Sequence, residues 1–106
     1  MEYIDFLRVL ADQTRLDILN LLQYEKKTSS EIQKTLNKSQ STISQHLKAL
    51  SNKNLIIFEK INNVRSYKIK NPNIFKLLLE IKSFVVQINQ EKLKNLRDLD
   101  VIDTLS

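Results

Sequence analysis

The side chains best suited to a binding function lie between Ser39 and Asn52, in the stretch S-Q-S-T-I-S-Q-H-L-K-A-L-S-N. Ile43, Leu47 and Leu50 recur there at helical spacing and predict a helix with one apolar face. The opposite face offers only hydroxyl, amide and ammonium groups, on Gln40, Ser41, Ser44, Gln45 and Lys48. Such groups can bond base edges and phosphates, and a helix of this kind fits a DNA major groove. We expect the rest of the chain to position this helix.

The charge distribution also indicates a nucleic-acid partner. The 106-residue chain has a net charge of +5, and residues 26–70 hold ten cationic side chains against two carboxylates, Glu31 and Glu59. A basic segment around such a helix is the electrostatic footprint of a nucleic-acid surface. A solvated lysine-rich surface would carry the same charge, so the inference depends on the polar side chains between the lysines.

Composition excludes several classes of protein. The chain has no cysteine, no glycine and a single histidine. Disulfides, thiolate metal sites and glycine-rich phosphate loops are therefore absent, and we expect neither an enzyme nor a metal or other cofactor. No apolar run is long enough to span a membrane, and the acidic N-terminus does not resemble a secretory signal, so we expect a cytoplasmic protein. Turns must rely on asparagine, which tolerates the left-handed region of backbone conformation.

Helical periodicity predicts three helices before the Ser39–Asn52 helix, over residues 2–11, from Asp12 to about residue 24, and from Thr28 through Leu36. Asp12 has the position of an N-cap, and Thr28 to Glu31 fits the T-x-x-E capping box. Asn37 is expected to end the third helix in a left-handed conformation. The third and fourth helices, joined by a short turn, predict a helix-turn-helix over residues 28–52.

Residues 55–70 change to a strand pattern, with β-branched and aromatic residues at 55–58 and 64–69 around an Asn62-Asn63 turn. Two such strands after a recognition helix form a wing. A long helix should follow, with Asn71 as cap and Pro72 at its first position, reaching the mid-nineties. The fold expected is mainly α with a small β-hairpin, a winged helix-turn-helix in the order α-α-α-α-β-β-α, forming one domain over residues 1–106. The tail from residue 98 is left open as an extension of the last helix.

The last helix is too apolar for a small domain to cover alone. A second copy of the chain is the simplest partner, since a two-fold dimer also suits two DNA half-sites. We expect a homodimer through residues 1–11 and 72–97, although an intramolecular core would explain the same pattern. The expected interface side chains are Tyr3, Phe6, Leu7, Leu78, Ile81, Val85 and Ile88.

Two motifs resemble those of the ArsR (arsenic-repressor) family of winged helix-turn-helix regulators. Residues 10–19, L-A-D-Q-T-R-L-D-I-L, resemble the family's second-helix signature L-A-D-P-T-R-x-x-I-L, with Gln13 in place of proline. Residues 39–50 resemble its recognition helix, S-Q-S-T-V-S-x-H-L-x-x-L, and residues 55–69, with Arg65 and Tyr67, resemble its wing. The resemblance spans roughly residues 3–80. It implies a homodimer that binds an operator and represses transcription until a signal arrives.

Carried over by position, the resemblance implies DNA contacts at Gln40, Ser41, Thr42, Ser44 and Gln45, and at Asn62, Asn63 and Arg65 of the wing. The residue pattern independently adds Lys48. Glutamine can pair bidentately with adenine, so Gln45, and secondarily Gln40, are the candidates for base discrimination. Lysine and arginine contacts would mainly position the protein on phosphates.

The chain departs from the family's metal-sensing members. Those members resemble one another in a Cys-x-Cys at the start of the third helix, where this chain has Thr28 and Ser30. Hydroxyls are poor ligands for soft metals, so we expect no metal site and leave the effector unknown. His46 is expected to pack or cap rather than contact a base. An acidic tail at Asp98, Asp100 and Asp103 is expected to be solvated.

Three functions remain in competition. The first is a dimeric, sequence-specific transcriptional regulator, probing double-stranded DNA with residues 40–52 and the 60–66 wing. The second is an architectural DNA-binding protein with little sequence preference, and the third is a winged-helix module that binds protein. The basic segment and the polar side chains of the fourth helix favour the first.

Overall fold

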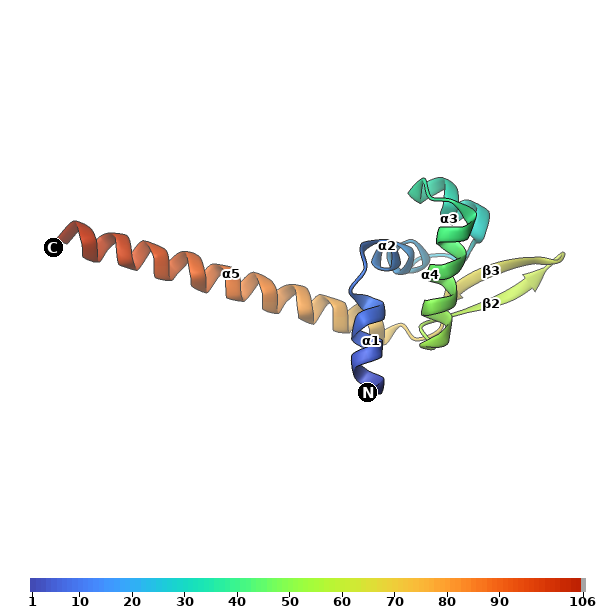
Figure 1. Cartoon of the computed structure of the whole chain (residues 1–106), viewed down its shortest axis with the longest axis horizontal. Helices are drawn as coiled ribbons and strands as arrows, with labels where there is room; N and C mark the ends of the chain where they lie inside the picture. The colour runs from blue at the N-terminus through green and yellow to red at the C-terminus, as the bar shows by residue number, and fades with distance from the viewer. Residues whose placement is uncertain (106) are drawn as a thin grey trace. The chain divides into compact units, whose positions relative to one another are not determined.

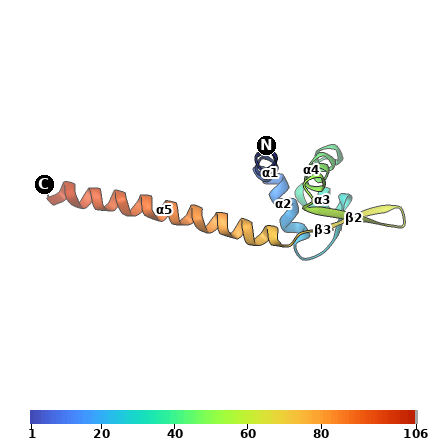
Figure 2. The ribbon, with the colours of Figure 1, turned by 90° about the horizontal axis from the view of Figure 1, so that it is seen from below.

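The computed structural model describes the backbone of residues 1–105 and the side chains of residues 1–99. The chain divides into two compact units, Met1–Pro72 and a second unit that begins at Asn73. The first unit holds α1 (Glu2–Leu10), α2 (Gln13–Leu22), β1 (Lys27–Thr28), α3 (Ser29–Leu36), α4 (Gln40–Asn52), β2 (Ile56–Ile61) and β3 (Val64–Ile69). Figures 1 and 2 show the β2–β3 hairpin extending from the helices beside α4. The winged helix-turn-helix fold expected from the sequence is confirmed.

N-caps are present at Asp12, Thr28 and Ser39, whereas Asn71, expected to cap the last helix, lies two residues before the first residue of α5, Asn73. The Asp12 carboxylate accepts a hydrogen bond from the Arg15 N–H at 3.0 Å. Thr28 and Glu31 form the reciprocal capping box, and the Ser39 hydroxyl accepts from the Thr42 N–H at 3.2 Å. Each cap satisfies a helix N–H that has no partner within the helix. The starts of α2, α3 and α4 are therefore fixed by local sequence.

Asparagine provides every backbone turn that requires a positive φ in the described residues. Asn37, Asn54, Asn62 and Asn63 have φ values of 53°, 57°, 53° and 64°. Asn37 ends α3 in the left-handed conformation, as expected, and the Asn62–Asn63 pair closes the hairpin. Two consecutive positive φ angles match the twist of a two-residue hairpin.

The sheet has one more strand than the sequence pattern predicts. β1 pairs antiparallel with β3, with Thr28 opposite Ser66, so the strand order is β1-β3-β2. Lys27 belongs to this strand, whereas the sequence pattern marks residues 25–27 as a polar break. Two residues are too few to show alternation, and only the tertiary pairing with β3 makes them a strand.

The core of the first unit joins the helices to the base of the hairpin. The fully buried side chains come from α2, α3, α4 and β2, and include Ile18, Leu19, Ile32, Ile43, Leu50 and Ile56. Burying each stabilises the fold by about 1.5–3 kcal/mol. The inner face of α4 is thus anchored, and its outer face is left in solvent.

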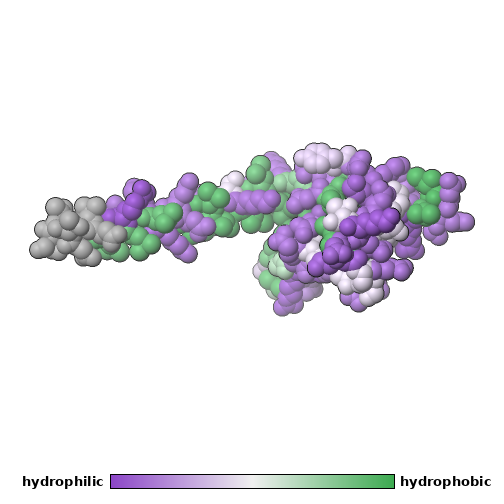
Figure 3. Space-filling model, turned by 90° about the horizontal axis from the view of Figure 1, so that it is seen from above, coloured by the Kyte–Doolittle hydropathy of each residue, from purple (hydrophilic) through white to green (hydrophobic). Residues whose placement is uncertain are grey.

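The second unit is one helix, α5 (Asn73–Leu105). It begins one residue after Pro72, because the chain passes Pro72 in a turn before helical hydrogen bonding starts. It also continues beyond the expected end in the mid-nineties; the side chains of Asp100 and Asp103 lie outside the described residues. Apolar side chains along it are exposed, among them Ile81, Val85 and Leu93 (Figure 3). No helix within the described residues is both long and apolar enough to cross a membrane.

Candidate nucleic-acid interface

The orientation of α4 is the one that its sequence predicts. Ile43, Leu47 and Leu50 are buried against the core. The predicted contact residues on the outer face are all exposed: Gln40, Ser41, Ser44, Gln45 and Lys48. None is acidic, so a phosphate backbone approaching this face meets only hydrogen-bonding groups and one positive charge.

Thr42 differs from its neighbours because it belongs to the helix cap. Its side chain is half-buried, and the Ser39 hydroxyl donates to Thr42 Oγ1 at 2.9 Å. One hydroxyl hydrogen of Thr42 remains for an outside acceptor. Thr42 therefore has a structural role in the cap of α4, in addition to the DNA contact predicted for it.

The wing presents two cationic side chains, Lys60 and Arg65, of which the sequence predicted only Arg65 as a contact. Arg65 and the turn residues Asn62 and Asn63 are exposed, as expected. Lys60 lies directly opposite Arg65 in the β2–β3 register, so both side chains project from the same face of the hairpin. The two-residue turn fixes this register, and pairing outward from the turn would have revealed Lys60.

The Arg65 side chain is held by an aromatic ring. Its guanidinium carbon lies 4.2 Å from the centroid of Phe58, which is two residues from Lys60 on β2 and on the same face of the hairpin. The Phe58 and Tyr67 rings are 5.7 Å apart and tilted by 54°. The cation–π contact orients the guanidinium without neutralising its charge.

The two carboxylates of the basic segment, Glu31 and Glu59, both have partners outside the proposed contact residues. The hydrogen bond from the Thr28 backbone lowers the pKa of Glu31, which serves the α3 cap. The Lys26 ammonium, 2.9 Å from Glu59, lowers the pKa of that carboxyl by hydrogen bonding. In the part of the chain whose side chains are described, no ion pair involves Lys48, Lys60 or Arg65. The positive potential of α4 and the wing is therefore not cancelled locally.

His46 lies on the inner side of α4 and contacts Arg15. Arg15 Nη1 is 3.1 Å from His46 Nδ1, and arginine can only donate, so Nδ1 accepts. The same guanidinium donates to the carbonyls of Val9 and Arg8 at the end of α1. Arg15 thus joins α1, α2 and α4. The sequence marks Arg15 only as part of the L-A-D-Q-T-R motif and gives no sign of this role.

The expected interface side chains divide between the two units. On α1, Tyr3 and Leu7 are 60% and 48% exposed, and Phe6 is half-buried. On α5, Ile81 and Val85 are 43% and 48% exposed, while Leu78 and Ile88 are half-buried. Large apolar side chains at these exposures suit association with another surface.

Within residues 1–99, the side chains include no cluster of three or more histidine, aspartate or glutamate residues able to hold a metal ion. Thr28, at a position where metal-sensing relatives have cysteine, uses its hydroxyl for the capping box with Glu31.

A helix-turn-helix with an acid-free polar face, followed by a basic hairpin, defines a winged helix-turn-helix protein that binds DNA. The family described as "Bacterial regulatory protein, arsR family" matches residues 12–57. Together with a solved possible transcriptional regulator for arsenical resistance, described next, this match shows that the chain belongs to the family. It is a DNA-binding transcriptional regulator.

Solved structures agree with this assignment. A possible transcriptional regulator for arsenical resistance is 30% identical, with 76% of this chain and 83% of that chain covered and a TM-score of 0.63. The transcriptional regulator HlyU from Vibrio vulnificus CMCP6 is 29% identical, covering 76% and 86%, with a TM-score of 0.64. Mb0332 from Mycobacterium bovis, described as a homodimeric winged helix-turn-helix DNA-binding domain, shares the fold at 20% identity, 84% and 82% coverage, and a TM-score of 0.71. No curated protein sequence matches the chain.

Proposed function

We propose that the protein is a dimeric repressor that reads a pseudo-palindromic operator, with α4 in the major groove and residues 60–66 of the wing on the flanking DNA. The observation that carries this proposal is the outer face of α4, where five polar side chains are exposed without an acidic neighbour. A helix fixed at its N-cap and along its buried face presents these side chains in one defined geometry.

The proposed contacts divide by chemistry. Gln45 and Gln40 discriminate bases, because an amide can pair bidentately with adenine. Ser41, Thr42 and Ser44 bond bases or phosphates. Lys48, Arg65 and the newly identified Lys60 neutralise phosphates and set the salt dependence, and the Asn62–Asn63 turn carries the wing tip to the DNA.

A homodimer explains the exposed apolar side chains of α1 and α5 and would place two copies of α4 on successive half-sites. The homodimeric Mycobacterium bovis domain, which has the same fold, supports this arrangement. We place the protein in the cytoplasm, where its DNA target lies, and assign it no catalytic role and no cofactor.

The test is binding to the promoter of the protein's own gene against a random duplex, across a salt series. A sequence-specific regulator should prefer the promoter by about 10³-fold or more at physiological salt. Expression of a reporter gene under that promoter should also rise when the regulator's gene is deleted. A preference near one would instead identify an architectural DNA-binding protein, and no binding to either duplex would favour a protein partner.

A further inference from the structure

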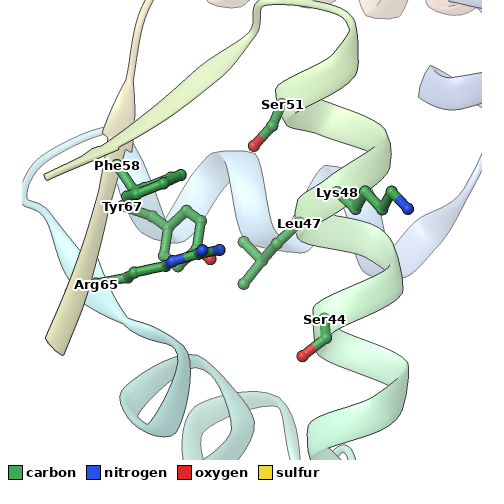
Figure 4. A pocket seen from close by; sticks show the side chains of 7 residues that line it. All are labelled: Ser44, Leu47, Lys48, Ser51, Phe58, Arg65 and Tyr67. Atoms are coloured by element: carbon green, nitrogen blue, oxygen red, sulfur yellow. The ribbon is translucent and has the colours of Figure 1, made fainter. Parts of the chain in front are cut away.

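A pocket of about 380 Å³ lies between α4 and the wing, and its volume is within the range of small-molecule sites. Figure 4 shows Leu47 directed from α4 into this space, facing the hairpin side chains. The residues that line it are Ser44, Leu47, Lys48, Ser51, Phe58, Arg65 and Tyr67. The Lys48 ammonium points away from the pocket, to the side of α4 away from the hairpin, so Arg65 supplies the cation inside the pocket.

The hydroxyl and guanidinium groups around the pocket form no hydrogen bond with another residue whose side chain the structure describes. Tyr67 is only 8% exposed, yet its hydroxyl makes no hydrogen bond to any residue with a described side chain. The same holds for the hydroxyls of Ser44 and Ser51, which are directed toward the hairpin, and for the Arg65 guanidinium. Among the described residues, no buried side-chain nitrogen or oxygen lacks a hydrogen-bond partner, so the unbonded Tyr67 hydroxyl reaches solvent and is open to a ligand.

These groups define the chemistry of a ligand. All four can donate hydrogen bonds, one carries a positive charge, and no carboxylate lines the pocket. One wall of the pocket is apolar, formed by the Phe58 and Tyr67 rings, which are tilted by 54° to each other, with Leu47 opposite. A complementary molecule has an anionic end for Arg65 and a planar apolar body for the rings.

We propose that this pocket binds a small aromatic carboxylate, and that the ligand displaces DNA by occupying Arg65 and Ser44. The carboxylate lies against Arg65 and the hydroxyls of Tyr67 and Ser44, and the aromatic body lies on Phe58. The displacement rests on the proposed DNA contacts of Ser44 and Arg65, whereas binding of the ligand does not depend on them.

A phosphodiester of the DNA backbone is the other anion that meets this surface. A strand crossing the rim can reach Ser44 and Arg65, but it brings no flat apolar group to the Phe58 ring. The aromatic rings of Phe58 and Tyr67 therefore favour a free ligand over the backbone.

The experiment uses the full chain and 2-naphthoate as the probe. Calorimetry on the DNA-free protein should show saturable binding, one molecule per chain. Anisotropy of a labelled promoter duplex should then show release by 2-naphthoate but not by acetate at the same ionic strength. If binding is absent, or if acetate releases the duplex equally well, the proposal is wrong.

Two variants and a matched control locate the site. Phe58→Leu should weaken 2-naphthoate binding by about three- to tenfold, because it removes the ring against which the ligand packs and which orients Arg65. Tyr67→Phe should weaken it by about two- to tenfold through the lost hydroxyl. Ile57→Leu changes the next residue of β2, on the opposite face, and should alter neither affinity. Circular dichroism melting checks that each variant is folded.

The outcomes separate this proposal from the proposed function. Equal 2-naphthoate affinity in Phe58→Leu and Ile57→Leu would overturn the pocket assignment. Weaker binding of every duplex by Phe58→Leu and Tyr67→Phe, with no 2-naphthoate binding, would assign the pocket to the DNA backbone. A wild-type protein that binds 2-naphthoate but shows no promoter preference would contradict the regulator and leave the ligand site in place.

Discussion

At the scale of single residues, Gln45 and Lys48 lie on the same exposed face of α4 but are expected to contribute differently to DNA binding, Gln45 to base preference and Lys48 to phosphate binding. Gln45→Ala should cost about 1–3 kcal/mol on the operator and relax base preference, because it removes an amide that can pair with a base edge. Lys48→Ala should weaken all sequences alike and flatten the salt dependence. Titrations of both variants against operator and random duplexes distinguish the two effects. Unchanged preference in Gln45→Ala would move direct readout to another residue.

Arg15 offers a prediction about stability. Its guanidinium, with 19% of the side chain exposed, contacts Val9, Arg8 and His46 at once, and an ammonium cannot reproduce that fork. Arg15→Lys should lower the free energy of unfolding by about 1–3 kcal/mol in urea denaturation. The matched control is Arg8→Lys, whose side chain is 78% exposed and makes only a surface ion pair with Asp5. Equal stability of the two variants would show that the Arg15 contacts contribute little.

The residue scale also shows where sequence reasoning stops. Asp12, Thr28 and Ser39 were predictable as caps because a cap is a contact over three residues of sequence. The bond from Arg15 to His46 joins residues 31 apart and depends on the packing of α2 against α4. No local pattern encodes it.

At the scale of elements, the start of α3 should respond to pH. Hydrogen bonding to Thr28 lowers the pKa of Glu31, so its stabilising effect is complete above its ordinary value of 4.5 and is lost as the pH falls through the folded-state pKa. Glu31→Gln should therefore be less stable than the wild type at pH 7, with the difference shrinking in acid. Thermal melts between pH 7 and about 3 measure this. A difference independent of pH would contradict the role of the charge.

Asp12 allows the same test at α2. The hydrogen bond from the Arg15 backbone lowers the pKa of Asp12. Asp12→Asn keeps a good capping side chain but removes the charge, so thermal melts across the same pH range should show a smaller loss of stability in acid than the wild type, while the helix remains capped.

The wing turn depends on two left-handed residues. Asn63 has φ 64°, where a Cβ costs about 1–2 kcal/mol unless the side chain compensates. Asn63→Ala should lower stability by about 1 kcal/mol, whereas Asn63→Gly should match or exceed the wild type. Chemical denaturation of the two variants provides the measurement, and equal losses in both would point to a side-chain contact of Asn63 instead.

Long periodic elements were predictable and short ones were not. Apolar spacing identified α1 to α4 within a residue or two at most boundaries, and the change to alternating residues identified β2 and β3. β1 has two residues and exists only through its pairing with β3. The end of α5 was left open because its apolar spacing weakens after Ile88, at Lys92 and Asn95.

At the scale of the whole molecule, the proposed dimer can be tested with one substitution. Ile81→Glu should place a charge in the interface and reduce the mass measured by light scattering to that of a monomer. Leu79→Glu is the matched control, because two residues along a helix turn the side chain by about 200° onto another face. An unchanged mass for Ile81→Glu would refute this interface.

The class of protein was predictable because two motifs and one basic segment mark a surface that local sequence encodes. The pocket beside α4 was not, because it assembles Ser44, Phe58 and Tyr67 from three elements. Their distances in sequence give no hint that they converge, and only the folded hairpin brings the aromatic rings opposite Leu47.

The four left-handed asparagines have a consequence for the unfolded chain. A glycine at each of these turns would relax the folded backbone, but it would also widen the set of conformations open to the denatured protein. With no glycine in its sequence, the chain has an unusually restricted denatured ensemble. Folding therefore gives up less backbone entropy, which compensates for the strain that Asn37, Asn54, Asn62 and Asn63 carry in the native turns.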